Sequence, residues 1–166
     1  MTLPAPSATA ASSALVIRRA SAQDLAMVVG LRAALRREEQ ALAGAGLVPE
    51  ESGGALRDLT RRQLADTSQG WFVATLGNEV CGILRCAIAR RDGVARYGVL
   101  TTAYVSPACR QRGALRALVG AAADWAGARG VSDLRVRTNT GNATANAAWE
   151  ALGFVPAQVI RRRVHP

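Results

Sequence analysis

Lysine is absent from this chain of 166 residues, so its formal net charge of +9 comes from arginine alone. Without lysine, the chain has neither the Gly-Lys-Ser/Thr phosphate loop of many nucleotide-binding proteins nor a lysine able to form a Schiff base. Histidine is almost as scarce, because the only one, His165, lies beside the C-terminus. Zinc sites and Ser-His-Asp triads need histidine in a structured cleft, so we expect neither and predict no metal site.

Cysteine occurs in an odd number and in no paired spacing, at positions 81, 86 and 109. This pattern, without a secretion signal, indicates reduced thiols rather than disulfides. Cys109 is expected to be exposed in a loop, but no basic partner is evident that would make its thiol a nucleophile.

Long apolar runs are also missing, and no stretch approaches the roughly 18 residues that cross a membrane. Residues 1–13 are small and polar, with neither a basic start nor an apolar block, so we interpret them as a disordered tail rather than a signal peptide. Residues 14–166 are predicted to form a single domain. The cytoplasm is the expected compartment, and no membrane partner is expected.

What the chain does contain is a succession of amphipathic strands and helices. Turn signals at Gly77-Asn78 and Asp92-Gly93 divide an antiparallel meander. A strand, helix, strand crossover follows, which implies a mixed sheet with helices on its faces. Strands are predicted at 15–18, 71–76, 80–89, 97–105, 134–136 and 159–164, and helices at about 21–42, 56–64, 113–129 and 145–152. The last strand is rich in arginine, as suits an edge.

The segment Val105–Val119 is the most informative part of the chain. A strand ends at Val105, and a loop with Arg110 and Arg112 leads through Gly113 into a helix. Such a turn directs backbone N–H groups and the positive end of the helix dipole at one place, and a glycine lets a ligand approach the backbone. The guanidinium groups beside it suit a pyrophosphate.

This segment resembles the Arg-x-x-Gly-x-Gly/Ala signature of the GNAT superfamily, the acetyl-CoA-dependent N-acetyltransferases. A second block, Asn142–Phe154, is similar to the family's Asn-x-x-Ala-x-x-x-Tyr-x-x-x-Gly-Phe pattern and follows in the expected order. The resemblance implies an α/β (α+β) fold, with a mixed, mostly antiparallel sheet of six or seven strands flanked by about four helices. It also implies acetyl-CoA as the acetyl donor and a primary amine, which the sequence does not identify, as the acceptor.

By this resemblance, the loop binds the pyrophosphate of the donor, and the preceding strand pairs with its pantetheine arm. The predicted cofactor-binding residues are Ala103, Val105, Arg110, Gln111, Arg112, Gly113, Ala114, Leu115, Asn142, Ala145 and Trp149. Leu115 stands where the family prefers Gly or Ala, so we expect its side chain to turn into the core. Plainer interpretations are also open, because a strand, loop and helix are a common turn and Asn142 is a good helix N-cap.

The catalytic groups are less clearly marked. Trp149 stands where the family commonly has a tyrosine acid, and an indole N–H is no useful acid, so core packing is its favoured interpretation. The strand before the loop has no glutamate to serve as a base. We name Tyr104 and Glu39 as catalytic candidates, although Tyr104 could equally pack and Glu39 could lie at a solvated helix end. The further candidate carboxylates are Glu38, Glu50 and Glu51.

The predicted function is transfer of an acetyl group from acetyl-CoA to a primary amine, by direct attack while both substrates are bound. The alternative is a non-catalytic module that binds acetyl-CoA or CoA as a sensor or partner-binding unit, which Trp149 and the missing glutamate support. Nucleic acid is not an expected partner, because aromatic residues make up only 4% of the chain. A homodimer is compatible with the short C-terminal strand.

Overall fold

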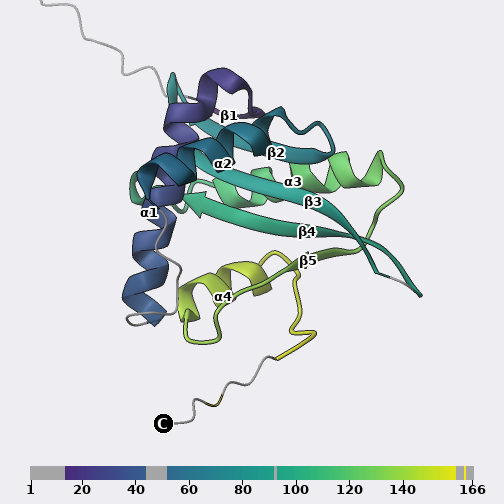
Figure 1. Cartoon of the computed structure of the whole chain (residues 1–166). Coiled ribbons are helices and arrows are strands. Elements are labelled where there is room, and N and C mark those ends of the chain that lie inside the picture. The colour runs from purple at the N-terminus through teal and green to yellow at the C-terminus, as the bar shows by residue number, and fades with distance from the viewer. Residues whose placement is uncertain (1–13, 44–51, 92, 160–162, 164–166) are drawn as a thin grey trace, which may run out of the picture.

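The computed structural model describes residues 14–43, 52–91, 93–159 and 163 (Figure 1). The predicted tail at 1–13 and the candidates Glu50 and Glu51 lie outside the described residues. The strands are β1 (Leu15–Arg19), β2 (Gln69–Leu76), β3 (Glu79–Arg91), β4 (Val94–Val105) and β5 (Leu134–Val136). The helices are α1 (Leu25–Ala43), α2 (Gly53–Ala65), α3 (Ala114–Gly127) and α4 (Ala143–Glu150), with 3-10 turns at Ala22–Asp24 and Pro107–Cys109.

The strands form one sheet in the order β1-β2-β3-β4-β5. Neighbouring strands from β1 to β4 are antiparallel and β5 is parallel to β4, so the predicted mixed, mostly antiparallel sheet is confirmed. The described residues contain five strands, rather than six or seven. Of the last predicted strand, 159–164, only residues 159 and 163 are described, and neither is in a strand.

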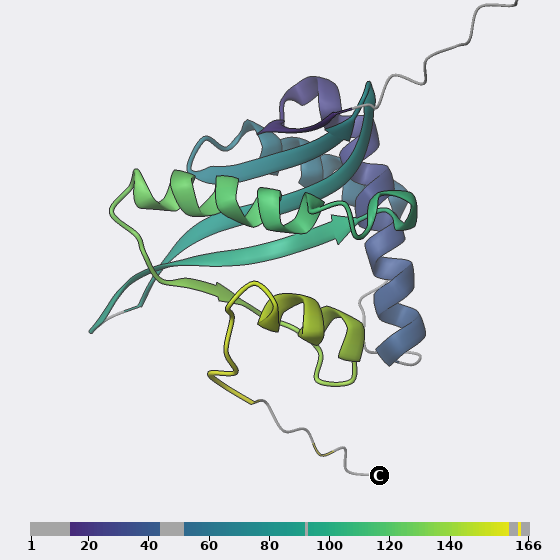
Figure 2. The same ribbon diagram turned by 180° about the vertical axis from the view of Figure 1, so that it is seen from behind.

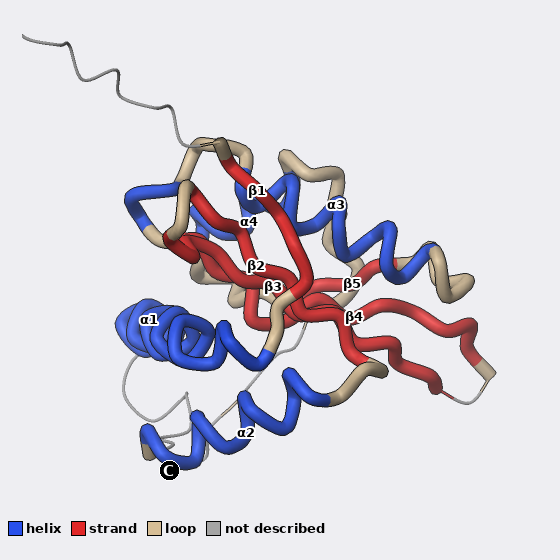
Figure 3. Tube along the Cα trace, turned by 90° about the horizontal axis from the view of Figure 1, so that it is seen from above, coloured by secondary structure: helices blue, strands red, loops and turns tan. Residues whose placement is uncertain are grey.

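Helices cover both faces of this sheet. Seen from above, α1 and α2 lie on one side of the sheet and α3 lies on the other (Figure 3). The α4 helix lies next to β5, at the edge of the sheet (Figure 2). The helices therefore bury both faces of the central strands, as a crossover after a meander predicts.

The core is divided into two clusters, one on each face. The cluster on the α1 side contains Trp71 and Val73, whereas Phe72 between them belongs to the cluster of α3 and α4. Successive side chains of a strand point to opposite faces, and this alternation places both faces of β2 in the core. The other large members of the α1-side cluster are Val28, Val80, Ile83 and Tyr104, and those of the α3-side cluster include Leu84, Leu100, Leu118 and Trp149.

A buried carboxylate fixes the entry into α1. The Asp24 oxygens accept hydrogen bonds from the Arg18 guanidinium at 2.7 and 2.8 Å and from the Ser21 N–H at 2.7 Å. The hydrogen-bonded Arg18 guanidinium holds the pKa of Asp24 down at about 2. Ser21 is the N-cap, as predicted, but the first turn is a 3-10 helix and the α-helix itself begins at Leu25.

The described cysteines are all free and buried. The expectation that Cys109 is exposed was wrong, because the 3-10 turn folds this residue back against the core, where only 5% of its surface is exposed. Burial, and then the adjacent Cys109 thiol, raises the pKa of Cys81 to about 12. A thiol with so high a pKa stays protonated, so Cys81 does not have the character of a nucleophile, and burial keeps Cys109 out of contact with solvent.

Candidate functional site

The outer edge of β4 is open over its last residues. The parallel partner β5 pairs only with residues 98–100 of β4, and no strand covers residues 101–105 within the described chain. Figure 2 shows β5 leaving β4, so that the two strands diverge towards the carboxyl end of β4. An extended ligand can add itself to such an edge, because the edge offers backbone N–H and C=O groups.

A β-bulge distorts β4 where this open edge begins. Tyr104 pairs with Ile83 of β3, but Thr101 pairs with Arg85, so β4 has an extra residue over the same interval. Thr102 absorbs the irregularity with a left-handed φ of 53°. Such conformations cost about 1–3 kcal/mol and gather at ligand sites. The bulge thus re-aims the backbone of β4 at the point where β5 departs.

The loop after β4 presents backbone N–H groups that donate to no partner among the described residues. Gln111 and Gly113 have left-handed φ values of 62° and 79°, and Gly113 is an N-cap without a side-chain hydrogen bond. Ala117 makes the first backbone bond of α3, to the Gly113 carbonyl. The N–H groups of residues 111–116 donate to no group in the described part of the chain. Together with the dipole of α3, they form a cradle for an anion.

Arg110 joins this loop to α1. Its guanidinium binds both oxygens of the Glu38 carboxylate at 2.7 and 2.9 Å, and its Nε donates to the Val105 carbonyl at 3.0 Å. The Tyr104 hydroxyl donates to Glu38 Oε1 at 3.1 Å. Burial, followed by the charge of Glu38, raises the pKa of Tyr104. Glu38 is therefore the acceptor that connects the end of β4 with the loop.

The predicted phosphate-binding residues differ in what they can offer to a ligand. The side chain of Arg110 is held by Glu38, and its N–H bonds to the preceding 3-10 turn. Gln111 and Arg112 are exposed, and Arg112 makes no side-chain hydrogen bond or ion pair to the described residues. Leu115 packs against the core, as expected, so its side chain leaves the cradle open. The buried Ala114 contributes only its backbone.

The second sequence block forms α4. Asn142 is the N-cap, and its Oδ1 accepts from the Ala145 N–H at 3.0 Å. Trp149 is 7% exposed and packs edge-to-face on Phe154, with ring centroids 5.2 Å apart. The capping role of Asn142 and the core packing of Trp149 are both confirmed. The half-buried Ala145 is the small residue between them.

Of the candidate carboxylates on α1, Glu38 reaches β4 and Glu39 does not. Glu39 makes no hydrogen bond to β4 in the described residues, and loss of surrounding water raises the pKa of its carboxyl, against the opposing charge of Arg36. Adjacent residues of a helix project about 100° apart, so only one of the two can face the strand. The sequence identified the pair but favoured Glu39, whereas the residue that contacts β4 is Glu38.

A group of polar side chains on the α1 face of the sheet was not predicted. Arg85 of β3 donates from Nε to Gln69 Oε1 at 2.6 Å and from Nη1 to Thr101 Oγ1 at 3.3 Å. Arg85 pairs across the strands with Trp71, and the Arg32 guanidinium lies 5.5 Å from the centroid of that indole ring. We call these five residues the arginine cluster. Burial lowers the pKa of Arg85.

The described residues contain no group of histidine, cysteine, aspartate and glutamate side chains that could hold a metal ion. They also contain no helix that is both long enough and apolar enough to cross a membrane.

Residues 33–154 match the model of the acetyltransferase (GNAT) family. This match spans both sequence blocks, the open edge of β4 and most of α1. No curated protein matches the chain significantly.

Solved structures share the fold at low sequence identity. A predicted acetyltransferase from Clostridium acetobutylicum, solved with acetyl-CoA, is 16% identical with a TM-score of 0.73, covering 91% of this chain and 96% of that one. The aminoglycoside N-acetyltransferase AAC(6')-Iy, solved with CoA, is 22% identical with a TM-score of 0.74, covering 95% and 99%. A GCN5-related N-acetyltransferase from Ralstonia eutropha JMP134 is 20% identical with a TM-score of 0.69, covering 91% and 99%.

Proposed function

Because this chain belongs to the acetyltransferase (GNAT) family, and is therefore an N-acetyltransferase with acetyl-CoA as its donor, we propose that it moves the acetyl group directly to a primary amine while both substrates are bound. The observation that carries this proposal is the open edge of β4, which runs into the unused N–H groups of residues 111–116. Coenzyme A has an amide-bearing arm that suits the edge and a pyrophosphate that suits the loop.

The loop supplies the charge that a pyrophosphate needs. The N–H groups of residues 111–116 bind its oxygens, and the exposed Arg112 guanidinium adds a full positive charge. Apart from Gly113 and its two chain neighbours, no atom of the described residues lies within 4 Å of the place that a Cβ on Gly113 would take, so a ligand can reach the backbone there. Arg110 contributes through its ion pair with Glu38, which holds the loop against α1.

The strand holds and polarises the reacting end of the donor. Residues 103–105 pair with the pantetheine arm as an added strand would, and the small Ala145 of α4 lets the arm pass. A backbone N–H at Ala103, next to the bulge at Thr102, polarises the thioester carbonyl as an oxyanion hole does. Holding the amine against this carbonyl supplies much of the acceleration, on the order of 7–11 kcal/mol in well-oriented systems.

Glu38 and Tyr104 provide the route for the proton. An alkyl ammonium has a pKa of about 10 and must lose its proton before it attacks. The Glu38 carboxylate accepts this proton through the Tyr104 hydroxyl, which already donates to it at 3.1 Å. As the amide forms, the thiolate of coenzyme A leaves and takes up the second proton, which the attacking nitrogen loses. Trp149 plays no part in this transfer, because it is packed in the core.

The described cysteines bear on the compartment in which the enzyme works. We place it in the cytoplasm, because its described cysteines are free thiols and a reducing compartment keeps thiols free. A homodimer stays a prediction, since the strand expected at 159–164 lies mostly outside the described residues. No nucleic acid is required by any step.

Calorimetric titration with acetyl-CoA, combined with a thiol-release assay over a panel of primary amines, tests the proposal. We expect binding, and release of free thiol with one class of amine. Binding without release from any amine would instead support a non-catalytic CoA-binding module. Absence of binding at millimolar acetyl-CoA would refute both functions and reduce the loop to a plain turn.

A further inference from the structure

We propose that the amine acceptor of this enzyme also carries a carboxylate, and that the Arg85 guanidinium binds this carboxylate within the arginine cluster. The inference rests on the proposed acetyl transfer, because it concerns the second substrate of the same site. It names the acceptor as an amino acid or a similar small zwitterion.

The arginine cluster lies beside the place where the reaction would occur. Thr101 immediately precedes the bulge at Thr102, and Arg85 is both its cross-strand partner and its hydrogen-bond donor. An attacking amine must come within about 3–3.5 Å of the acyl carbon, which the proposed donor position puts at Ala103. The remaining groups of a small acceptor then extend over the α1 face of β3 and β4, where Arg85 is the nearest formal charge on the strands.

The Arg85 guanidinium is partly shielded from water, but no carboxylate of the described residues pairs with it directly. It is half-buried, and its hydrogen bonds go to the neutral side chains of Gln69 and Thr101. The closest carboxylate in this network, Asp66, is one side chain removed, because its Oδ2 accepts from Gln69 Nε2 at 2.6 Å. The other N–H bonds of the Arg85 guanidinium have no partner among the described residues. A cation in this position is costly, and a bound anion would offset that cost.

The surroundings of Arg85 offer donors to a ligand rather than acceptors. The Trp71 indole N–H is buried, with 2% of the residue exposed, and has no hydrogen-bond partner in the described residues. The Arg32 guanidinium lies 5.5 Å from the centroid of that indole ring and donates to Thr60 at 2.7 Å and to Gln63 at 2.9 Å. A carboxylate accepts hydrogen bonds and donates none, so it complements this set of groups.

The carboxylate that lies nearest the open edge is already bound by the protein. Glu38 is taken by Arg110 and Tyr104, so it does not neutralise Arg85. A polyamine or an aminoglycoside, which carries several ammonium groups and no carboxylate, would meet repulsion from the cluster. A planar carboxylate, by contrast, matches the fork of a guanidinium. The cluster therefore selects zwitterionic acceptors and works against cationic ones.

The experiment offers each amine twice, as the carboxylate and as the carboxamide, for example glycine with glycinamide, β-alanine with β-alaninamide and phenylalanine with phenylalaninamide. Thiol release is measured for the full-length enzyme with saturating acetyl-CoA. The carboxamide has the more acidic ammonium, so intrinsic reactivity favours it and runs against the expected result. We expect kcat/KM to be at least about tenfold higher for the carboxylate in the productive pair, which corresponds to about 1.4 kcal/mol.

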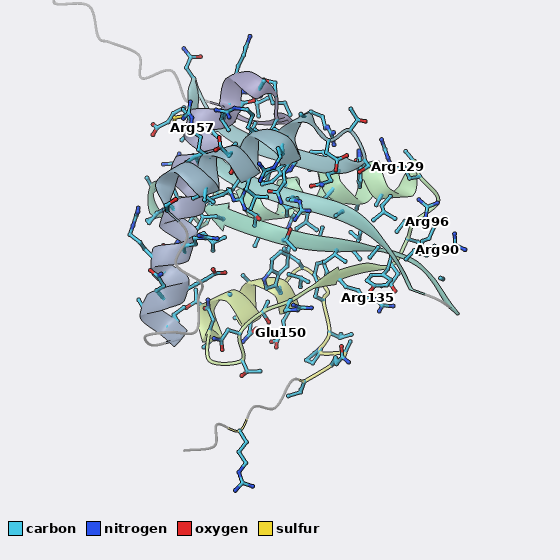
Figure 4. All side chains as sticks on the ribbon, viewed as in Figure 1. Arg57, Arg90, Arg96, Arg129, Arg135 and Glu150 are labelled. Carbon is cyan, nitrogen blue, oxygen red and sulfur yellow. The ribbon has the colours of Figure 1, made fainter. Side chains whose placement is uncertain are left out.

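Variants assign the preference to Arg85. In Arg85→Met the ratio of kcat/KM between carboxylate and carboxamide should fall to one or below, whereas Arg85→Lys keeps the charge and should retain part of the preference. Arg90→Met is the matched control, because Arg90 is an exposed arginine of the same strand near its hairpin end (Figure 4). Acetyl-CoA titration and circular dichroism of each variant show whether the donor site and the fold are intact.

A second readout does not depend on turnover. N-acetylphenylalanine and its carboxamide are titrated into the complex of enzyme and CoA, and only the carboxylate form should lose affinity in Arg85→Met. Equal or better use of carboxamides, or turnover restricted to amines without a carboxylate, would overturn this inference. Failure to bind acetyl-CoA, or binding without turnover of any amine, would instead contradict the proposed function itself.

Discussion

The guanidinium of Arg110 donates hydrogen bonds to both oxygens of the Glu38 carboxylate, although the two residues are 72 positions apart in the sequence. This contact ties the loop that would hold the donor to the helix that borders the acceptor side of the sheet. Both side chains are nearly half exposed, so the ion pair contributes about 0–1 kcal/mol to stability. Its importance is positional, because the same carboxylate also accepts from Tyr104.

Glu38→Gln should slow catalysis without removing the fold. The amide still accepts from Tyr104, but it cannot take up a proton, so we expect kcat to fall about 100-fold at neutral pH. The loss should shrink as pH rises towards about 10, where the acceptor amine is already neutral in solution. Steady-state kinetics across this pH range, with acetyl-CoA affinity measured separately, checks the prediction.

Comparing the loss of kcat in Glu38→Gln with that in Glu39→Gln tests which of the two carboxylates accepts the proton. The structure predicts the larger loss for Glu38, and a larger loss for Glu39 would restore the residue favoured by the sequence alone. Glu150→Gln is a suitable control, since Glu150 is an exposed carboxylate on α4 (Figure 4).

Gly113→Ala should weaken acetyl-CoA binding by about tenfold, because the added Cβ occupies the approach to the backbone cradle. It should also cost about 1 kcal/mol of stability, since the φ of 79° is unfavourable for alanine. Gly130→Ala is the matched control. Gly130 has a similar φ of 73° with open space around it, but it lies at the other end of α3, so it should lose stability alone. Equal binding by the two variants would contradict the cradle.

Asp24→Asn should destabilise the protein by about 1–2 kcal/mol at pH 7, allowing for the partial exposure of Arg18. The folded-state pKa of Asp24, about 2, lies below its ordinary value of 3.8, so its contribution is fully present above pH 3.8. As pH falls through about 2 the contribution is lost, and the difference between wild type and variant should close. Urea unfolding at a series of pH values measures this difference, and a pH-independent gap would argue against the ion pair.

The thiols should react slowly in the folded protein. Burial and a pKa of about 12 keep Cys81 protonated, and Cys109 and Cys86 are buried too. We expect little colour from Ellman's reagent under native conditions at pH 8 and full titration of the three cysteines after unfolding in guanidinium. Rapid reaction of one thiol in the native state would restore the exposed position that the sequence predicted for Cys109.

The sequence predicted most of the strands and helices, and the loop that leads into α3, because these depend on local patterns. Gly113 and the apolar stripe beginning at Leu115 define where α3 starts, whatever the rest of the chain does. The strand ends were less well placed, and β2 begins at Gln69 rather than at Trp71. That extension depends on pairing with β3, which local propensity does not encode.

The parts of the site that involve distant residues were not predictable in this way. The bulge at Thr102 and the position of Arg85 beside Thr101 follow from the strand register, which the sequence pattern alone does not reveal. The choice of Glu38 over Glu39 depends on how α1 is rotated against β4. The only signal of the arginine cluster in the sequence was Arg85, a single arginine in an otherwise apolar stretch of β3. A strand at a solvent-exposed edge of the sheet would account for an arginine there equally well.

The sheet of this protein is in one respect unfinished. The parallel pairing between β5 and β4 ends at Leu100, after three residue pairs, and β5 leaves the rest of this edge of β4 unpaired. If the proposed function is right, acetyl-CoA itself pairs with this edge and acts as a strand that can dissociate. Ligand at about 100 times its Kd would then add about 2.7 kcal/mol of stability. The supply of acetyl-CoA would thus set the lifetime of the enzyme as well as its rate.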